Sequence, residues 1–216
     1  MPRVGLSTAD VVAAAAAMAD KDGYGAVALA PLAARLGVKP PALYKHVESL
    51  GDLRHRIAAL AMAELSEVLR DALQGKAGQE ALEAMFIAFR EYVAAHPGRY
   101  SATVGAEFLG PDDPLYVAGL RVITSIRAVL SGYGIPPDDL DHAIRTLRSL
   151  IQGFALLQAA SGFQWSNDPD ESFAWMLRFA DKGLRGMGDL PWDSGAETGH
   201  PATDAGRPGT GASDDL

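Results

Sequence analysis

The residue types that enzymes use are present, but their spacing supports no catalytic or metal site. The 216-residue sequence has no cysteine, which excludes disulfides, thiolate metal ligands and a cysteine nucleophile. No two of its five histidines lie three or four residues apart, so the local spacing of a zinc site is absent. No serine lies in a G-x-S-x-G motif, and no glycine-rich loop continues into a phosphate-binding pattern. We therefore expect neither an enzyme nor a bound metal or cofactor.

Two pairs of neighbouring carboxylates are the nearest approach to a catalytic acid and base. Asp112–Asp113 and Asp138–Asp139 each lie just before or at an expected helix start. There a carboxylate can accept hydrogen bonds from free backbone N–H groups and complement the helix dipole. We interpret both pairs as helix caps.

Charge is distributed unevenly along the chain. The formal net charge is −8, yet residues 1–60 carry seven Lys and Arg against five Asp and Glu. The remainder carries twelve against twenty-two. Such asymmetry is a pointer to an interaction surface, here a relatively basic one near the N-terminus.

The apolar composition indicates a folded protein without a membrane span. Apolar residues make up 48% of the chain, which excludes wholesale disorder. The longest uncharged apolar run, from Val11 to Ala19, is too short to cross a bilayer. Acids flank it and only Arg3 precedes it as a basic residue, which argues against a signal peptide. We expect a cytoplasmic protein with no membrane contact.

The elements that must position any functional residues are helices. Ser7 is placed to cap a helix, and Asp10 is an acid suited to its first turn. Glycines and prolines, Pro97–Gly98 among them, divide the chain into segments with apolar residues at spacings of three and four. The pattern predicts helices over residues 8–20, 29–36, 42–47, 51–73, 79–96, 114–131, 137–161 and 169–187. No alternation is long enough for a sheet, so the expected fold is all-α.

Residues 28–47 meet the requirements of a helix-turn-helix. Ala33 is small enough for two helices to cross closely, and Gly37 suits a left-handed turn four residues later. The apolar side chains that would form a small core are Leu32, Leu36, Val38, Leu43 and Val47.

The remaining face of the last helix in this motif could contact DNA. Lysine and tyrosine can bond phosphates, while proline and alanine can touch thymine methyl groups. The candidate DNA-binding residues are Lys39, Pro41, Ala42, Tyr44, Lys45 and His46. On this motif alone, an ordinary helical hairpin with a basic rim remains open.

A family resemblance favours the DNA-binding alternative. Residues 7–56, with LAARLGV at 32–38 and ALYKHV at 42–47, resemble the DNA-binding domain of the TetR family of transcriptional regulators. Where that family often has Ser or Thr before the second helix, this chain has Ala28. We therefore expect that helix to begin without a side-chain cap.

A second resemblance lies in the C-terminal half. RTLRSLIQGFALLQ at 145–158, SGF at 161–163 and DESF at 170–173 resemble the WHG-type ligand-binding domain of one TetR subgroup. At the positions of that subgroup's His and Glu, this chain has Gln152 and Gln158. If these two amides face a pocket, the ligand charge preference differs from that of relatives.

The resemblance implies a homodimer built by the last two long helices. Apolar residues recur there at threes and fours, and the candidate interface residues are Leu147, Ile151, Phe154, Phe173 and Leu177. The alternative, that these faces are the core of a monomer, cannot be separated by sequence. Recognition of two half-sites favours the dimer.

An effector pocket is expected among the middle helices. Its candidate residues are Phe89, Tyr92, Tyr100, Phe108, Tyr116, Arg121, Gln152 and Gln158, with Phe86, Ile123 and Trp165 as further possible walls. For each aromatic residue, plain core packing is the competing interpretation.

These observations predict three segments and one function. Residues 1–50 form a three-helix helix-turn-helix domain, 51–188 a larger helical domain for effector binding and dimerisation, and 189–216 a disordered tail. The expected protein is a homodimeric repressor that leaves double-stranded operator DNA when a small, largely apolar effector binds. The alternatives are an all-α binding protein or enzyme without a DNA role, and a TetR-like protein that has no small-molecule effector.

Overall fold

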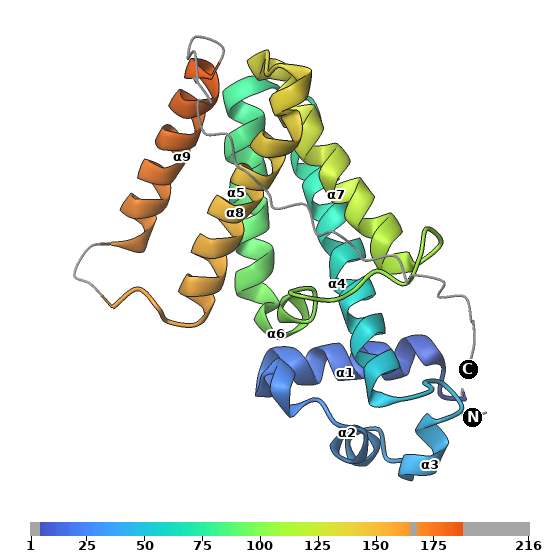
Figure 1. The fold of residues 1–216 in the computed structure, drawn as a ribbon. Coiled ribbons are helices and arrows are strands. Elements are labelled where there is room, and N and C mark those ends of the chain that lie inside the picture. The colour runs from blue at the N-terminus through green and yellow to red at the C-terminus, as the bar shows by residue number, and fades with distance from the viewer. Residues whose placement is uncertain (1–4, 165–167, 188–216) are drawn as a thin grey trace, which may run out of the picture.

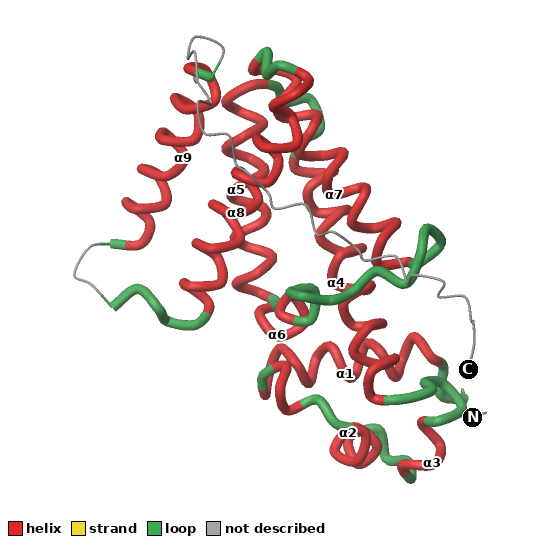
Figure 2. Tube along the Cα trace, in the orientation of Figure 1, coloured by secondary structure: helices red, strands yellow, loops and turns green. Residues whose placement is uncertain are grey.

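Helices account for the regular structure of residues 5–164 and 168–187, the part of the chain that the computed structural model describes (Figures 1 and 2). No strand occurs in these residues, so the all-α prediction is confirmed. Trp165 and the expected tail lie outside them.

The N-terminal helices form one end of the molecule (Figure 1). They are α1 (Thr8–Asp22), α2 (Leu29–Arg35) and α3 (Pro40–Leu43). Ser7 and Asp10 cap α1 reciprocally: the Asp10 N–H donates to Ser7 Oγ at 3.1 Å, and the Ser7 N–H donates to Asp10 Oδ2 at 2.9 Å. As expected, Ala28 gives α2 no side-chain cap.

The larger part of the molecule is a bundle of long helices. They are α4 (Leu50–Ala72), α5 (Gly78–Ala95), α7 (Pro114–Leu130), α8 (Leu140–Ala159) and α9 (Pro169–Gly186). α4 packs chiefly against α7, and α5 against α8, while α9 lies on the outer side against α5 and α8 (Figure 1). Large buried side chains such as Phe86, Leu65 and Leu82 form the core between them.

A short helix lies where the sequence analysis placed a break. α6 (Pro97–Ser101) follows α5 directly, because proline at a first helical position loses no intrahelical hydrogen bond. It packs on α1 so closely that a Cβ atom at Gly98 would lie 1.8 Å from the Ala19 carbonyl oxygen. Single 3₁₀ turns at Tyr24–Ala26 and Ser131–Tyr133 also went unpredicted. The predicted helix over 137–161 begins as a 3₁₀ turn, Pro137–Asp139, and continues as α8.

One segment of the described chain, Pro114–Tyr133, is long and apolar enough to cross a membrane by length and composition. α7 makes up most of it and buries Leu115, Val122 and Ile126 within the bundle. A core helix meets the same two criteria, so this segment gives no argument for a membrane span.

Candidate functional site

The turn between α2 and α3 has the geometry that its sequence predicts. Gly37 adopts a φ of +68°, a left-handed conformation that suits glycine. The Val38 N–H donates to the Ala33 carbonyl oxygen at 3.0 Å and closes the end of α2. Leu32, Ala33 and Leu43 are buried, so the two helices share a small apolar core.

α3 is shorter than predicted, although its helical turns continue. The helix begins at Pro40 and ends at Leu43. Beyond it, the His46 and Val47 N–H groups both donate to the Leu43 carbonyl oxygen, at 2.8 and 3.0 Å. The backbone therefore carries the following residues as a continuation of α3.

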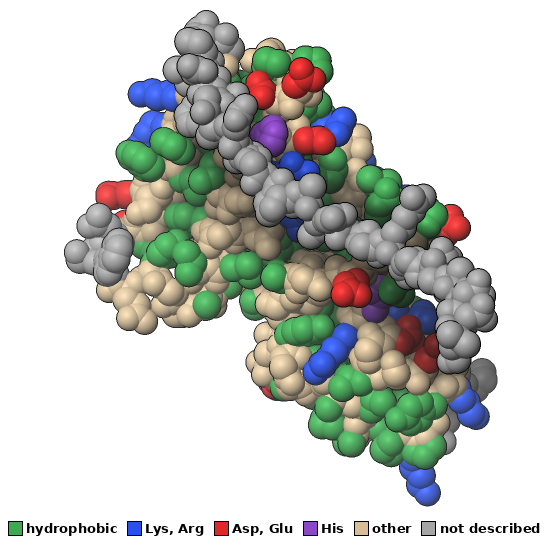
Figure 3. Space-filling view, viewed as in Figure 1, with side chains coloured by type: hydrophobic (Ala, Val, Ile, Leu, Met, Phe, Trp, Pro, Cys, Tyr) green, Lys and Arg blue, Asp and Glu red, His purple; other side chains and the backbone are tan. Residues whose placement is uncertain are grey.

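Most of the predicted DNA-binding residues lie on α3 or directly beside it, and are exposed. Tyr44 is 58% exposed, and Lys39, Pro41 and Lys45 are exposed as well. Figure 3 shows Lys and Arg side chains (blue) at this end of the molecule.

Two of the predicted residues are less accessible. Ala42 is half-buried, and so is His46, whose Nδ1 lies 3.5 Å from the Thr8 hydroxyl of α1. His46 is thus placed to hold α3 against α1 as well as to face outward.

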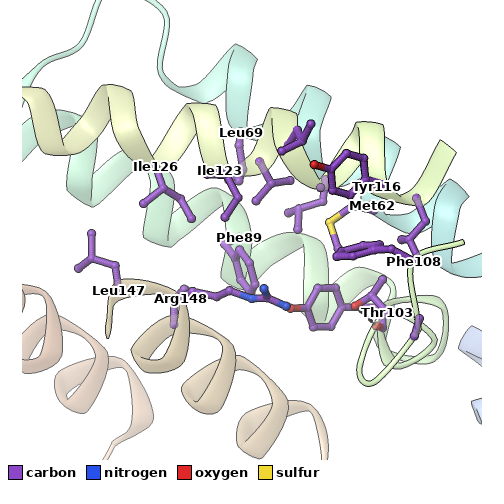
Figure 4. Close-up of a pocket in the computed structure, with 18 of the residues that line it drawn as sticks. Met62, Leu69, Phe89, Thr103, Phe108, Tyr116, Ile123, Ile126, Leu147 and Arg148 are labelled. Atoms are coloured by element: carbon purple, nitrogen blue, oxygen red, sulfur yellow. Dashed lines mark hydrogen bonds between the residues drawn. The ribbon is translucent and has the colours of Figure 1, made fainter. Parts of the chain in front are cut away.

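A cavity of about 340 Å³ lies between α4, α5, α6, α7 and α8 (Figure 4). Four predicted aromatic residues line it as edge-to-face pairs. Phe89 and Tyr100 have ring centroids 5.4 Å apart, and Phe108 and Tyr116 have centroids 5.3 Å apart. Predicted Ile123 also lines it, whereas Phe86 is core.

The structure places Tyr92 outside this cavity. Its hydroxyl donates toward Glu64 Oε2 at 2.8 Å and lies 3.0 Å from the Ala61 carbonyl oxygen, both on α4. Burial is the main cause that raises the pKa of Tyr92, and the hydrogen bond and negative charge of Glu64 raise it further. The partner that a buried tyrosine needs is thus a carboxylate of the scaffold rather than a ligand.

The predicted polar contacts also lie outside the cavity. Arg121 is largely exposed and pairs with Glu67 at 3.9 Å. Gln152 accepts a hydrogen bond from Arg148 Nε at 3.2 Å, and Gln158 accepts one from Arg90 Nε at 2.7 Å. None of the three lines the cavity, so their expected placement was wrong.

Two polar residues that line the cavity, Thr103 and Arg148, were not predicted from the sequence. Much of the apolar wall was not predicted either: Met62, Leu65, Leu69, Met85, Leu115, Leu120, Val122 and Ile126. Arg148 lies four residues after Ile144 and three before Ile151, both buried on α8, and this helical spacing was the available signal.

The predicted dimer residues are mostly internal to the protomer. Leu147 and Ile151 are buried and line the cavity. Phe173 is buried against Phe154, with ring centroids 5.2 Å apart, and Leu177 is half-buried. A charge at Leu147 would therefore disrupt the protomer core and would not report on a dimer.

The exposed apolar side chains of α8 and α9 are different residues. Leu157, Trp175 and Phe179 are 52%, 60% and 54% exposed. The Trp175 and Phe179 rings stack with centroids 5.4 Å apart and planes 12° apart. We refer to these three residues as the outer α8–α9 face.

Comparison with known proteins identifies the family. A family model described as "Tetracyclin repressor-like, C-terminal domain" matches residues 82–180. The HTH-type transcriptional regulator Rv0681 of Mycobacterium tuberculosis is 35% identical over 173 residues, which are 80% of this chain and 78% of that protein. The chain belongs to the TetR family of transcriptional regulators. It is a regulator rather than an enzyme.

Further relatives agree with this membership. The Bacillus subtilis HTH-type regulator YobS is 30% identical over 185 residues, which cover 85% of this TetR-family chain and 95% of YobS. The crystal structure of BioQ with its double-stranded DNA operator has a TM-score of 0.62 at 22% identity and covers 84% of this chain and 99% of BioQ. A complex of minocycline with a TetR variant from Acinetobacter baumannii has a TM-score of 0.63 at 24% identity, covering 83% and 97%. Both structures share the fold.

In this TetR-family chain, an ion-pair network fastens the α2–α3 end to the bundle. Arg99 on α6 donates from Nε to Asp20 on α1 at 2.8 Å and from Nη1 to Glu64 on α4 at 2.9 Å. The Arg99 N–H also donates to Asp20 at 2.8 Å. Since Tyr100 follows Arg99 and lines the cavity, α6 touches both the cavity and α1.

A second contact ties the cavity loop to α4. Asp113 caps α7 and accepts from the Leu115 and Leu109 N–H groups, each at 3.0 Å, and lies 2.9 Å from His55 Nε2 of α4. Burial alone raises the pKa of Asp113, but the hydrogen bonds from Leu109, His55 and Leu115 together lower it. The carboxylate is thus ionised, so His55 Nε2 donates. We refer to these hydrogen bonds of Asp113 as the Asp113 clamp. Phe108 of the cavity wall directly precedes Leu109, one of the donors.

Proposed function

We propose that this TetR-family regulator is a homodimeric repressor that binds a double-stranded operator through α3 and leaves it when a small effector fills the cavity. The observation that carries the DNA-binding part is the exposed Lys39, Tyr44 and Lys45 on a motif whose inner face is buried. The BioQ–operator complex, which shares the fold, supports it.

The operator contact can be tested at α3. We expect Lys45→Ala to weaken binding about equally across sequences and to reduce the slope of log K against log salt by about 0.9, because one phosphate contact is lost. Tyr44→Phe should weaken binding by about 1 kcal/mol if its hydroxyl bonds a phosphate. The measurement is fluorescence anisotropy with a DNA fragment identified by footprinting beside the protein's own gene.

Lys76→Ala is the matched control for that measurement. Lys76 is an exposed lysine just beyond the far end of α4, where its Nζ donates to the Ala72 carbonyl oxygen at 3.0 Å. The Lys76→Ala substitution removes one positive charge, as Lys45→Ala does, but at a position far from α3 in the sequence. If the two α3 variants bind DNA as well as this control does, α3 is not the reading element.

The outer α8–α9 face supports the dimer. Large apolar side chains that stay exposed in a protomer are typical of association surfaces, and two-fold pairing gives the two copies of α3 needed for half-sites. We expect Phe179→Glu to weaken the dimer by about 2 kcal/mol, since it removes a central aromatic contact and introduces a charge.

Sedimentation equilibrium measures that loss. Val68→Glu is the control, because Val68 is also an exposed apolar residue, at 37%, but lies on α4. An unchanged dimer in Phe179→Glu, or equal dissociation in both variants, would place the interface elsewhere.

The cavity supports the effector part of the proposal. Its walls are largely apolar, and the minocycline complex of a protein with the same fold shows that protein holding a small molecule. An effector that moves the population from mostly DNA-competent to mostly incompetent needs a differential affinity of about 10⁴-fold. α6 and the Asp113 clamp are the contacts through which a filled cavity can favour one placement of α1–α3.

A further inference from the structure

Arg148 stands out among the residues that line the cavity. It is the only charged residue in the lining formed by the described part of the chain. Figure 4 shows its side chain extending from α8 past Phe89 in the direction of Thr103, across a space bounded by apolar walls. Arg148 is an exposed residue, so water solvates its charge at the mouth of the cavity, and a ligand that covers the guanidinium must replace that solvation.

Arg148 differs from other arginines of the bundle in its hydrogen-bond partner. Several other arginines of the bundle pair with carboxylates: Arg90 with Asp170, Arg99 with Asp20, Arg121 with Glu67, and Arg127 with Asp141. Arg148 instead donates to a neutral amide, Gln152 Oε1, at 3.2 Å. Within residues 5–164 and 168–187, no carboxylate oxygen lies within 4.0 Å of its guanidinium nitrogens.

Tyr100, which lines the cavity near Arg148, can donate a hydrogen bond to a ligand. Burial raises the pKa of Tyr100 to about 12, although the positive charge of Arg148 acts in the opposite direction. Tyr100 therefore stays protonated at neutral pH and can donate a hydrogen bond. Thr103 lies beside it, with its hydroxyl donating to the Tyr100 carbonyl oxygen at 2.8 Å. Because the Thr103 proton is used in that bond, the lining offers an anion the Arg148 cation and the Tyr100 hydroxyl, and it contains no acid.

We propose that the ligand of this cavity is an apolar anion, whose carboxylate or sulfonate pairs with Arg148 and whose body fills the space between α4, α5 and α7. This inference rests on the proposed effector function and specifies the ligand class. The cavity volume of about 340 Å³ is near the lower end of the range for small-molecule sites, which limits the body to a compact one. A planar guanidinium suits such an anion because it can donate two parallel hydrogen bonds.

Two fluorescent probes of nearly the same shape test the charge requirement. 8-Anilinonaphthalene-1-sulfonate has a sulfonate, and N-phenyl-1-naphthylamine has the same rings without it. We expect the sulfonate probe to bind the wild type more tightly, and Arg148→Met to weaken it by about tenfold while leaving the neutral probe unchanged. Arg145→Met is the matched control, because it removes an exposed arginine from the same helix that does not line the cavity.

A blocking variant shows whether the probes occupy the cavity or the outer α8–α9 face. Gly119 lines the cavity on α7, and a Cβ atom there would meet only the Phe108 ring, at 3.8 Å. Gly119→Leu should therefore fill the space without backbone strain and weaken both probes. Phe179→Glu should leave cavity binding unchanged.

Two results would overturn the inference, and they separate it from the proposed function. If Gly119→Leu weakens both probes but Arg148→Met affects neither, the cavity binds ligands without preferring anions, and the effector site stands. If Gly119→Leu changes neither probe, the cavity is not a ligand site, and the effector part of the proposed function falls as well. Operator binding is measured separately and is unaffected by either result.

Discussion

Replacing Arg99 with methionine is expected to lower the free energy of unfolding by about 3 kcal/mol, because the substitution leaves two carboxylates without their shared cation. The Arg99 side chain is only 14% exposed, and that of Asp20 is 15% exposed. Glu64 keeps 34% of its side chain in contact with water, which places the effect near the lower end of the range for buried pairs. Urea denaturation at neutral pH measures it.

Arg70→Met is the matched control for this prediction. Arg70 also contacts two acids, Glu67 and Asp71, but its side chain is 59% exposed. Water and salt screen such a surface cluster, so its loss should cost less than about 1 kcal/mol. Equal destabilisation of the two variants would mean that burial does not strengthen the Arg99 network.

The position of the Arg99 network connects it to the proposed function. It joins α6 to α1 at the point where Gly98 leaves no room for a side chain against Ala19. α4 is the covalent link between α1–α3 and the bundle, but α6 gives a second, non-covalent one. In the proposed function, a ligand that displaces Tyr100 moves the neighbouring Arg99, which supports α1. Both steps depend on α6, which the sequence did not reveal.

The sequence predicted the helix-turn-helix well because its signals are local. Gly37 is needed within the turn itself, Ala33 lies at the helix crossing, and the Ser7–Asp10 cap involves residues three apart. α6 went unpredicted because Pro97–Gly98 has the composition of a loop. What makes it a helix is packing on α1, some eighty residues earlier in the chain, and no local pattern records that contact.

The aromatic residues of the cavity could be predicted from the sequence, whereas its polar residues could not. Aromatic residues on the inner faces of α5 and α7 follow helical periodicity, so Phe89 and Tyr116 were found. The polar residues depend on tertiary partners instead. Tyr92 lies three residues from Phe89, yet its hydroxyl meets Glu64 of α4. On α8, apolar residues occupy an inner and an outer face, and periodicity alone cannot say which of them faces a second protomer.

Asp113→Ala is expected to lower the free energy of unfolding by about 2–3 kcal/mol, since it removes a helix cap and leaves hydrogen-bond donors unpaired. The Asp113 side chain is 2% exposed and accepts from two backbone N–H groups and from His55. Asp139→Ala is the control: Asp139 also precedes a helix, α8, but makes no side-chain cap hydrogen bond there. Its loss should be within about 0.5 kcal/mol of neutral.

The pH dependence of this difference follows from the lowered pKa of Asp113. Because the folded-state value lies below the ordinary value of 3.8, the carboxylate stabilises the fold fully above pH 3.8, and the contribution is lost as pH falls through the folded value. Urea titrations should therefore show a constant difference in the free energy of unfolding between wild type and Asp113→Ala from neutral pH down to about pH 4. Below that pH the difference should become smaller, because Asp113 of the wild type also loses its charge. If this difference disappears between pH 7 and pH 5, a different group is responsible. If Asp139→Ala lowers the free energy of unfolding as much as Asp113→Ala does, the hydrogen bonds from Leu109 and His55 add nothing to an ordinary helix start.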